Sequence, residues 1–365
     1  MHFGLYEARL LWSAVTGDHK ILPKRLQPHV ATINLTENCQ SRCRMCDYWR
    51  TSKPSPITEE RAARLVEELR EAGVGTLRFL GGEPLLRKDL FAVLEHAAPL
   101  GFERIVLATN GLLLDRFASE VNRSCITNLT VSIDGLADTN DAIRGAPGYF
   151  ERVMRNLTLI HNKRIKLATL LSDQLAADIH GLIAICRSRD YLLDVNLPSF
   201  DLPYASSPAA REGIRSLWPS EESVETVLRA LVEAGYLTSS LADGCREYLT
   251  HRRYPMHHCL HGYVSLLIRS NGDLTLGCYQ KKPLGNILEQ PLSTILVASL
   301  VRAEARSMFE LDCERCVCGW AISYVLAHPV PNATYAFRRV DPRPLTERGP
   351  GRVPLPVLVH PDPAQ

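Results

Sequence analysis

The sequence predicts an α/β fold: an open (β/α)6 barrel, that is, a partial TIM barrel, followed by a small unit built on a β-hairpin and a helix. Two observations predict it. Between residues 30 and 200, six short β-rich runs alternate with amphipathic helical stretches, which implies a parallel sheet with right-handed crossovers. Farther on, "NGD" (271–273) is a turn signal between two apolar runs. Six β-α units rather than eight leave the barrel open, and active-site residues should lie on the loops that follow the strands.

The predicted strands are short runs rich in β-branched and aliphatic residues, at 30–35, 76–80, 104–109, 128–133, 165–171 and 192–197. After the first of them, "TEERAARLVEELREAG" (58–73) has apolar residues at helical spacing. Thr58 is its expected N-cap, and Gly73 is its expected stop. This stretch defines the first helix of the barrel.

The segments that flank the barrel have different patterns. The start of the chain is expected to be helical, and the β-α regularity ends near Phe200. "PYASSPAAREG" (203–213) is interpreted as a linker, and a helix is expected around 220–235. The predicted parts are a helical lead-in at 1–29, the barrel at 30–200, a linker region with helix at 201–258, the hairpin unit at 259–335 and a Pro-rich tail without regular structure at 336–365.

The charge balance is nearly neutral. The chain has 42 Lys and Arg against 40 Asp and Glu, which argues against a broad electrostatic surface for nucleic acid or anionic membrane. No apolar run is long enough to span a bilayer, and the start lacks the pattern of a signal peptide. We therefore expect a soluble cytoplasmic protein with no nucleic-acid and no membrane partner. Eleven cysteines in that compartment favour metal ligation or redox chemistry over disulfides.

Three of these cysteines lie close together in the sequence, on one predicted loop. Cys39, Cys43 and Cys46 follow the first predicted strand with the spacing C-x3-C-x2-C. A structural zinc site wants four ligands, commonly as C-x2-C pairs, and no histidine follows closely here. Three thiolates suit an iron–sulfur cluster better, and they leave one iron without a protein ligand. A zinc knuckle and buried free thiols stay open as alternatives.

Motifs on the following strand ends agree with the cluster. "GGEP" (81–84) follows the second strand, "ATNG" (108–111) the third and "VSIDG" (131–135) the fourth, with "IRG" (143–145) downstream. Together with the cysteine loop, over residues 30–200, they resemble the radical S-adenosylmethionine (SAM) superfamily. The resemblance implies that the three cysteines hold a [4Fe–4S] cluster whose open iron binds SAM. It also implies that one electron cleaves SAM to methionine and a 5′-deoxyadenosyl radical, which takes a hydrogen atom from the substrate.

The same resemblance implies which residues contact SAM. Glycines let a backbone approach a ligand, and a carboxylate can accept hydrogen bonds from an ammonium group. A forked contact from an arginine suits the SAM carboxylate. The expected SAM-binding residues are Gly81, Gly82, Glu83, Pro84, Asn110, Ser132, Asp134 and Arg144. Two features depart from the family pattern: Met45 stands where an aromatic residue is common, and "LLSDQL" (170–175) lacks the Gly- and Ile-containing pattern of the fifth strand.

A second group of cysteines lies near the hairpin. Cys259 and Cys278 flank it, and "CERCVC" contains Cys313 and Cys316. This layout resembles the Twitch extension of some radical SAM enzymes, which implies that these four cysteines hold an auxiliary [4Fe–4S] cluster. Four ligands close a site, so this cluster would carry electrons rather than bind SAM. The larger SPASM arrangement, with two auxiliary clusters, needs more cysteines than this region contains.

Two alternatives concern the same region. A zinc site could use His257, His258 or His261 beside Cys259 in place of the cluster. Cys318 is a spare thiol, and we predict it as a catalytic residue that donates a hydrogen atom to the substrate radical in an epimerisation. A buried structural cysteine or an alternative cluster ligand is the other interpretation of Cys318.

The substrate class rests on weaker signals. Enzymes of the resembled type act on ribosomal peptides, sulfatase residues, sugars or aminocyclitols, and many that modify peptides carry a leader-binding domain. Because only 38 residues precede Cys39, we predict a small polyol instead: a sugar, aminoglycoside, aminocyclitol or nucleoside intermediate of antibiotic or related biosynthesis. It would be dehydrogenated or epimerised at a carbinol carbon. Dehydration of a 1,2-diol, or modification of a ribosomally made peptide, is the alternative, and a non-enzymatic electron carrier agrees least with the motifs. The expected partner is an external one-electron reductant, flavodoxin- or ferredoxin-like.

Overall fold

The computed structural model describes residues 5–51, 53–199, 205–251, 257–278 and 282–312. Within them, six parallel strands lie side by side in chain order: β1 (Val30–Asn34), β2 (Thr76–Leu80), β3 (Arg104–Thr109), β4 (Asn128–Ser132), β5 (Arg164–Leu170) and β6 (Leu192–Asn196). The first three strands start in register, with Val30 opposite Thr76 and Thr76 opposite Arg104. Every strand lies within one residue of its predicted bounds. The predicted parallel α/β fold is therefore confirmed.

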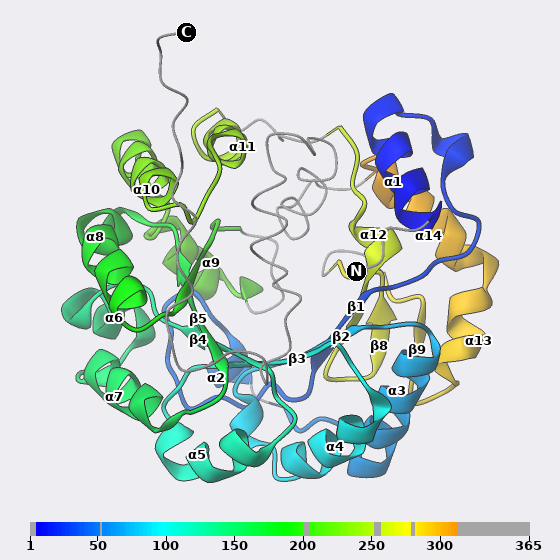
Figure 1. Ribbon diagram of the computed structural model, residues 1–365, viewed down its shortest axis with the longest axis horizontal. Helices are drawn as coiled ribbons and strands as arrows, with labels where there is room; N and C mark the ends of the chain where they lie inside the picture. Colours follow the sequence, from blue (N-terminus) through cyan, green and yellow to red (C-terminus); the bar gives the residue numbers. More distant parts are fainter. Residues whose placement is uncertain (1–4, 52, 200–204, 252–256, 279–281, 313–365) are drawn as a thin grey trace, which may run out of the picture.

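Helices cover the outer side of the curved sheet, and the strands line its inner side (Figure 1). The covering helices are α3 (Glu59–Glu71), α4 (Leu90–Ala97), α5 (Leu114–Arg123), α6 (Ala137–Arg144), α7 (Tyr149–Asn156) and α8 (Asp173–Ser188). In α3, the N-cap Thr58 accepts a hydrogen bond from Arg61 N (3.2 Å), as predicted. Its apolar face buries Leu65 and Leu69 against the sheet. This repeated layer of helix on sheet holds the strand ends in fixed positions.

The predicted hairpin is confirmed, and it continues the barrel sheet. β7 (Ser265–Ile268) pairs in parallel with β1, and β8 (Asp273–Thr275) pairs antiparallel with β7. With β9 (Gly285–Asn286), the sheet of the described residues runs β6-β5-β4-β3-β2-β1-β7-β8-β9. The helices around this edge are α1 (Leu5–Thr16), α12 (His261–Val264), α13 (Leu292–Val297) and α14 (Ser299–Phe309). The edge of the open barrel at β1 is thus covered by the hairpin.

The interpretation of 203–213 as a linker is wrong for its second half. α9 (Pro208–Arg215) begins there, with Ser207 as its N-cap and a proline at its first position. A serine cap before a proline is a helix start, because the proline nitrogen needs no partner there. α10 (Glu221–Glu233) confirms the helix expected around 220–235, and α11 (Ser239–Leu249) packs against it. Within the described ranges, no helix is long and apolar enough to cross a membrane.

Candidate active site

The three cysteines lie on one loop, residues 35–47, which joins the carboxyl end of β1 to the short helix α2 (Tyr48–Thr51). We call this segment the cysteine loop. Cys43 is buried, and Cys39 and Cys46 are half-buried. The loop contains neither helix nor strand. Contacts with neighbouring strand ends must therefore hold its ligands in place.

The backbone of the cysteine loop is hydrogen-bonded to the segment that follows β2. Gly82 N donates to Thr36 O (2.7 Å), and Glu83 N donates to Asn38 O (2.8 Å). A Cβ atom at Gly81 would overlap Thr36 O, and one at Gly82 would overlap Asn38 O. Gly81 also has φ of +148°, a conformation that favours glycine. The close approach of the cysteine loop thus requires both glycines, and their contact with SAM stays a prediction.

The Glu83 side chain is fully buried and joins the ends of β2 and β3. Its carboxylate accepts hydrogen bonds from Thr109 Oγ1 (2.8 Å), Asn110 N (2.7 Å) and Leu85 N (3.1 Å). Burial raises the pKa of Glu83 to about 7, although these hydrogen bonds act in the opposite direction. Both carboxylate oxygens are engaged within the protein, so Glu83 positions Asn110. A contact of this side chain with the SAM ammonium group stays a prediction.

Two polar side chains reach the sulfur atoms of the cysteine loop. Asn110 Nδ2 lies 3.8 Å from Cys39 Sγ, and Arg144 Nη1 lies 3.8 Å from Cys43 Sγ. Arg144 ends α6, and its Nη2 forms an ion pair with Asp134 (2.6 Å). Donors and positive charge beside a sulfur stabilise the thiolate, which is the form that binds metal. Three of the predicted SAM-binding residues are therefore gathered at the cysteine loop.

The other predicted SAM-binding residues lie at the same end of the sheet. Ser132 is the last residue of β4 and is half-buried, and Pro84 opens a short 3-10 turn directly after Glu83. The buried Asp134 also accepts a hydrogen bond from Leu170 N (2.9 Å), which ties the end of β4 to β5. Their contacts with SAM stay predictions from the resemblance.

The donor set fits an iron–sulfur cluster. Burial raises the pKa of Cys39 to about 11 and that of Cys46 to about 12, and it also raises the pKa of Cys43. These thiols must therefore release protons when metal binds. Nowhere in the described part of the chain do three His, Cys, Asp or Glu side chains converge as a single metal ion requires. Three soft thiolate ligands on one loop are a donor set that an iron–sulfur cluster takes, with one iron left for another ligand.

A buried hydrogen-bond donor beside the cysteine loop also agrees with a cluster or SAM bound there. Arg144 Nε is buried and has no hydrogen-bond partner among the described residues. Such a group is costly unless something accepts from it. A cluster sulfur or the SAM carboxylate would supply an acceptor. The unpaired donor thus agrees with a ligand bound at the cysteine loop.

Sequence reasoning missed Tyr149, which supports the middle of the cysteine loop. Its hydroxyl donates to Asn110 O (3.3 Å) and lies 2.9 Å from Ser41 Oγ. Because the tyrosine proton is used on Asn110, Ser41 donates to the tyrosine oxygen. Burial raises the pKa of Tyr149, so it stays protonated at neutral pH. Nothing in the local sequence separates this tyrosine from an ordinary core residue.

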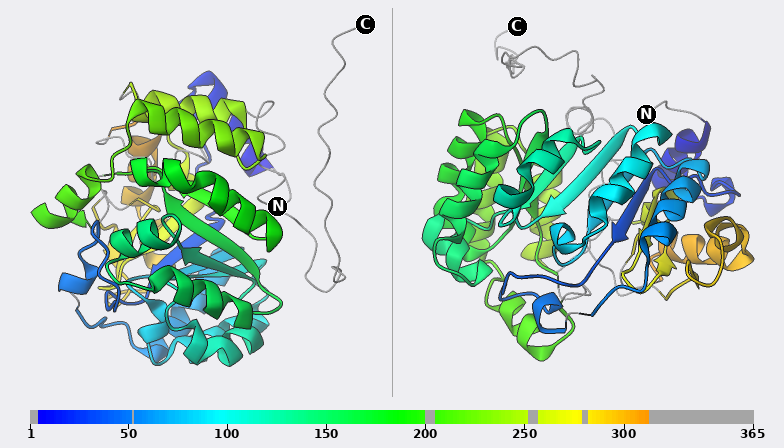
Figure 2. Two further views of the ribbon diagram at one scale, coloured as in Figure 1. Left: turned by 90° about the vertical axis from the view of Figure 1, so that its left-hand side faces the viewer. Right: turned by 90° about the horizontal axis from the view of Figure 1, so that it is seen from below.

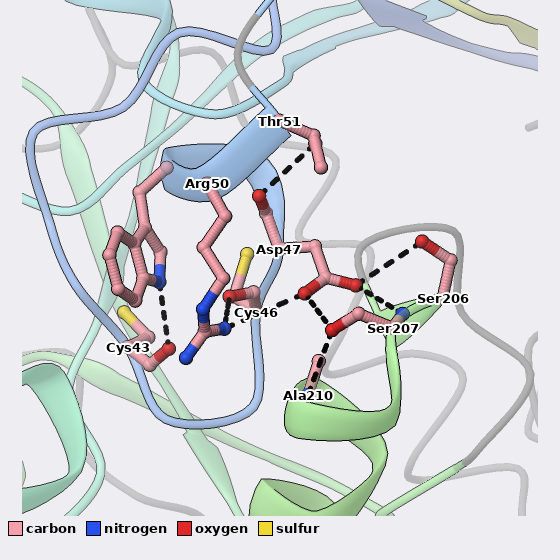
Figure 3. A network of polar contacts seen from close by, with 9 residues as sticks. Cys43, Cys46, Asp47, Arg50, Thr51, Ser206, Ser207 and Ala210 are labelled. Atoms are coloured by element: carbon pink, nitrogen blue, oxygen red, sulfur yellow. Dashed lines mark hydrogen bonds and ion pairs between the residues drawn. The ribbon is translucent and has the colours of Figure 1, made fainter.

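Two side chains of α2, also missed, bind carbonyl groups of the cysteine loop (Figure 3). Trp49 Nε1 donates to Cys43 O (3.2 Å), and Arg50 Nη1 donates to Cys46 O (2.9 Å). The Arg50 guanidinium also lies over the Trp49 ring, 4.1 Å from its centre. The loop is thus held by α2 as well as by the strand ends.

Only part of the second cysteine group lies in the described residues. Cys259 is half-buried before α12, and Cys278 is buried after β8. Cys313, Cys316 and Cys318 lie outside the described residues. The auxiliary cluster and the catalytic role of Cys318 therefore stay predictions.

The histidines near Cys259 have contacts of their own. His261 Nε2 lies 2.9 Å from Gly277 O, so this nitrogen carries the proton. Burial lowers the pKa of His261 to about 4, which keeps the ring neutral. His258 stacks on Phe309 with ring centres 4.2 Å apart. Both rings therefore have contacts within the protein, and the zinc site that would use these histidines stays an alternative prediction.

The fold is an open α/β barrel with three cysteine thiols on the loop after its first strand, and solved structures share this fold. The structure of "Native anSMEcpe with bound AdoMet" is similar with a TM-score of 0.54 at 15% sequence identity, over 86% of this chain and 100% of that chain. Identity this low is evidence of the fold alone.

Sequence comparisons define the family. Residues 33–173, which contain the cysteine loop and the motifs on the strand ends, match the Radical SAM superfamily. "Fe-coproporphyrin III synthase" of Methanosarcina barkeri is 27% identical over 350 residues, 83% of this chain and 85% of that protein. "AdoMet-dependent heme synthase" of the same organism is 34% identical over 137 residues, 36% of this chain and 39% of that protein. The chain is an enzyme of the radical SAM superfamily.

Proposed function

We propose that this enzyme cleaves SAM reductively at the cysteine loop and abstracts a hydrogen atom from a substrate bound at the carboxyl ends of the strands. The observation that carries the proposal is the gathering of three thiols on one loop, two of them within 3.8 Å of polar donors from the SAM motifs. Cys39, Cys43 and Cys46 would hold the cluster, which when bound would supply the electron that cleaves SAM to methionine and a 5′-deoxyadenosyl radical. 5′-Deoxyadenosine would be the product once that radical had taken the substrate hydrogen atom.

Residues around the cysteine loop contact the cysteine sulfur atoms and orient one another. Asn110 and Arg144 donate toward cysteine sulfurs, and Asp134 orients the Arg144 guanidinium. The Glu83 carboxylate holds Asn110 in place by accepting a hydrogen bond from the Asn110 backbone N–H. These contacts would position groups around a bound SAM.

For the substrate, we propose a tetrapyrrole. The support is the alignment over 83% of the chain with a relative named Fe-coproporphyrin III synthase, together with a second relative named as a heme synthase. Both names refer to tetrapyrrole products. The small polyol predicted from the sequence, dehydrogenated or epimerised at a carbinol carbon, has no such support and is kept as the alternative outcome of the product assay.

An auxiliary [4Fe–4S] cluster on Cys259, Cys278, Cys313 and Cys316 belongs to the same proposal. The cysteine spacing supports it, as does the position of the first two at the hairpin that extends the sheet. The cluster would carry electrons to or from the substrate site. A protein in which Cys39, Cys43 and Cys46 are all alanine should then still bind about four irons per chain. Zinc, or no metal, in that variant would contradict the proposal.

The proposed partner is an acidic one-electron carrier of the flavodoxin or ferredoxin type, and a cytoplasmic location stays a prediction. Arg42, Arg44 and Arg50 are exposed around the cysteine loop and supply positive charge next to the cluster ligands. Charge complementarity raises association rates and is weakened by salt. Replacing Arg42 and Arg44 with glutamate should slow cluster reduction by a purified flavodoxin but not by dithionite. Equal rates with flavodoxin before and after the change would count against this surface.

The test of the central proposal is reductive cleavage of SAM by the anaerobically reconstituted protein. With dithionite and SAM, the wild type should form 5′-deoxyadenosine, and the triple alanine variant of the cysteine loop should form none. Coproheme-type tetrapyrroles and polyols are then supplied in turn, and mass spectrometry identifies which one is altered as 5′-deoxyadenosine accumulates. A triple variant as active as the wild type would refute the proposed site.

A further inference from the structure

Asp47 follows the third cysteine and joins the cysteine loop to α9 (Figure 3). Its Oδ1 accepts a hydrogen bond from Ser207 Oγ (2.5 Å), and its Oδ2 accepts from Ser207 N (2.6 Å) and Ser206 Oγ (3.2 Å). The residue is only 1% exposed, so water does not compete for these bonds. Ser207 Oγ in turn accepts from Ala210 N (3.1 Å) as the N-cap of α9. One carboxylate thus fixes the start of α9 on the end of the cysteine loop.

The backbones of α9 and the loop are also in direct contact. A Cβ atom at Gly213 would lie 2.6 Å from the carbonyl carbon of Arg44, so a larger residue would push the helix away. Around this contact, a small apolar cluster combines Cys43 and Met45 of the loop with Ile214 of α9. It is separate from the main core. α9 lies beside the cysteine loop in Figure 2 and covers one side of it.

Each cysteine therefore has an anchor of its own. Asn110 donates toward Cys39, and Arg144 donates toward Cys43. The end of the loop at Cys46 is held through the neighbouring Asp47. A loop without regular structure keeps three ligands in place only if such supports are present.

We propose that Asp47 is a positioning residue for the iron–sulfur cluster: it couples the cysteine loop to α9, so that cluster binding and α9 docking stabilise each other. The inference rests on the proposed function, because it requires the cluster to be held by the cysteine loop. Coupling of this kind is reciprocal. If α9 docking strengthens cluster binding, then the bound cluster must lower the equilibrium population of undocked α9 by the same factor. Charge-assisted hydrogen bonds at a helix N-terminus carry the coupling.

The chain contains a matched control for this contact. Asp173 Oδ1 accepts from Ser220 N (2.7 Å) and Ser220 Oγ (2.8 Å), and Ser220 is the N-cap of α10. The aspartate–serine contact is of the same kind, but Asp173 is exposed whereas Asp47 is buried and also pairs with Arg50 (3.5 Å). The control contact joins α8 to α10 instead of the cysteine loop to α9. Asp173→Asn therefore measures what the loss of such a cap does to the fold in general.

The experiment compares Asp47→Asn, Ser207→Ala and Asp173→Asn in the full-length reconstituted protein. The first readout is the rate of iron release to bathophenanthroline, after subtraction of the iron that the triple alanine variant of the cysteine loop releases. Asp47→Asn should release iron about tenfold faster than the wild type, because a charge-assisted hydrogen bond of this kind contributes at least one factor of ten. Ser207→Ala should change the rate in the same direction, and Asp173→Asn should not change it.

The second readout is amide hydrogen exchange over residues 205–217, with and without the cluster. In the wild type and Asp173→Asn, loading the cluster should slow exchange in α9 about tenfold, because exchange reports the equilibrium population of opened α9. In Asp47→Asn, loading should make no difference. A purely structural role of Asp47 would instead lower the thermal stability of Asp47→Asn and leave the cluster-dependent protection of α9 intact.

Wild-type iron release and wild-type α9 protection in Asp47→Asn would overturn the inference, and so would equal effects in Asp173→Asn. Failure of the proposed function has a different signature. The wild type and the triple alanine variant would then contain the same amount of iron. Reconstitution would also leave amide exchange in α9 of the wild type unchanged.

Discussion

Replacing Gly82 with alanine should displace the cysteine loop and lower its cluster content. The new Cβ would lie 2.6 Å from Glu37 O and would overlap Asn38 O, whereas real contacts of this kind are essentially never under 3.0 Å. Relief of the Glu37 O contact alone requires a movement of 0.4 Å, the difference between 3.0 and 2.6, and relief of the closer Asn38 O contact requires more. That movement stretches the hydrogen bond from Glu83 N to Asn38 O (2.8 Å), one residue before Cys39.

The cost has two parts. Overpacking against rigid backbone typically costs about 1–3 kcal/mol, and loss of one hydrogen bond adds about 1 kcal/mol. We expect the free energy of unfolding to fall by about 2–4 kcal/mol, measured by urea unfolding. Iron bound per chain after reconstitution, and the rate of 5′-deoxyadenosine formation, should fall together.

Gly75→Ala is the control, because its Cβ would meet only the flexible end of the Glu103 side chain, at 3.1 Å. It should keep near wild-type stability, iron content and activity. A Gly82→Ala protein with wild-type unfolding energy and iron content would refute the reasoning that the glycine is needed for loop packing. Equal losses in Gly75→Ala would do the same.

Two further predictions concern charges at the site. The pKa of Glu83 is about 7 in the folded protein against 4.5 as the ordinary value, so the unfolded chain ionises first. The contribution of Glu83 to the free energy of unfolding is complete below pH 4.5 and falls by about 3 kcal/mol as the pH rises from 4.5 through about 7. Wild-type minus Glu83→Gln unfolding energies of the cluster-free protein should follow that fall, and a constant difference would contradict it. His261, with its pKa lowered to about 4, gives the opposite slope in both proteins, so only their difference is informative. Arg144→Met removes the donor at Cys43 and should raise the rate of iron release to a chelator about tenfold. Arg152→Met, which breaks an exposed ion pair, should leave that rate unchanged. Equal rates of iron release in the two variants would refute the role of Arg144.

Much of the fold could be predicted because its signals are local. The strands lie within one residue of their predicted bounds, and Thr58 caps α3 as expected, since a cap and a hydrophobic period need only neighbouring residues. The pairing of β7 with β1 has no such signal, because it joins segments more than two hundred residues apart. A hairpin motif predicts its own two strands and not the strand on which it docks.

The site shows the same division. The motifs identified Asn110 and Arg144, which do lie at the cysteine sulfurs. They did not predict that Glu83 uses both oxygens inside the protein, because a motif marks a residue and not the atoms it uses. The contact of Asp47 with Ser207 spans 160 positions and depends on a helix that was interpreted as a linker. Its serine and proline were the local signal that a helix begins there.

The most direct test of the central claim is whether SAM binds the cluster on the cysteine loop. The electron paramagnetic resonance spectrum of the dithionite-reduced, reconstituted protein is recorded before and after SAM is added. We predict that SAM changes the spectrum of the wild type, because one iron has no protein ligand. The variant with Cys39, Cys43 and Cys46 replaced by alanine should show no change on SAM addition. A wild-type spectrum that SAM leaves unchanged, or an equal change in the triple variant, would contradict the account.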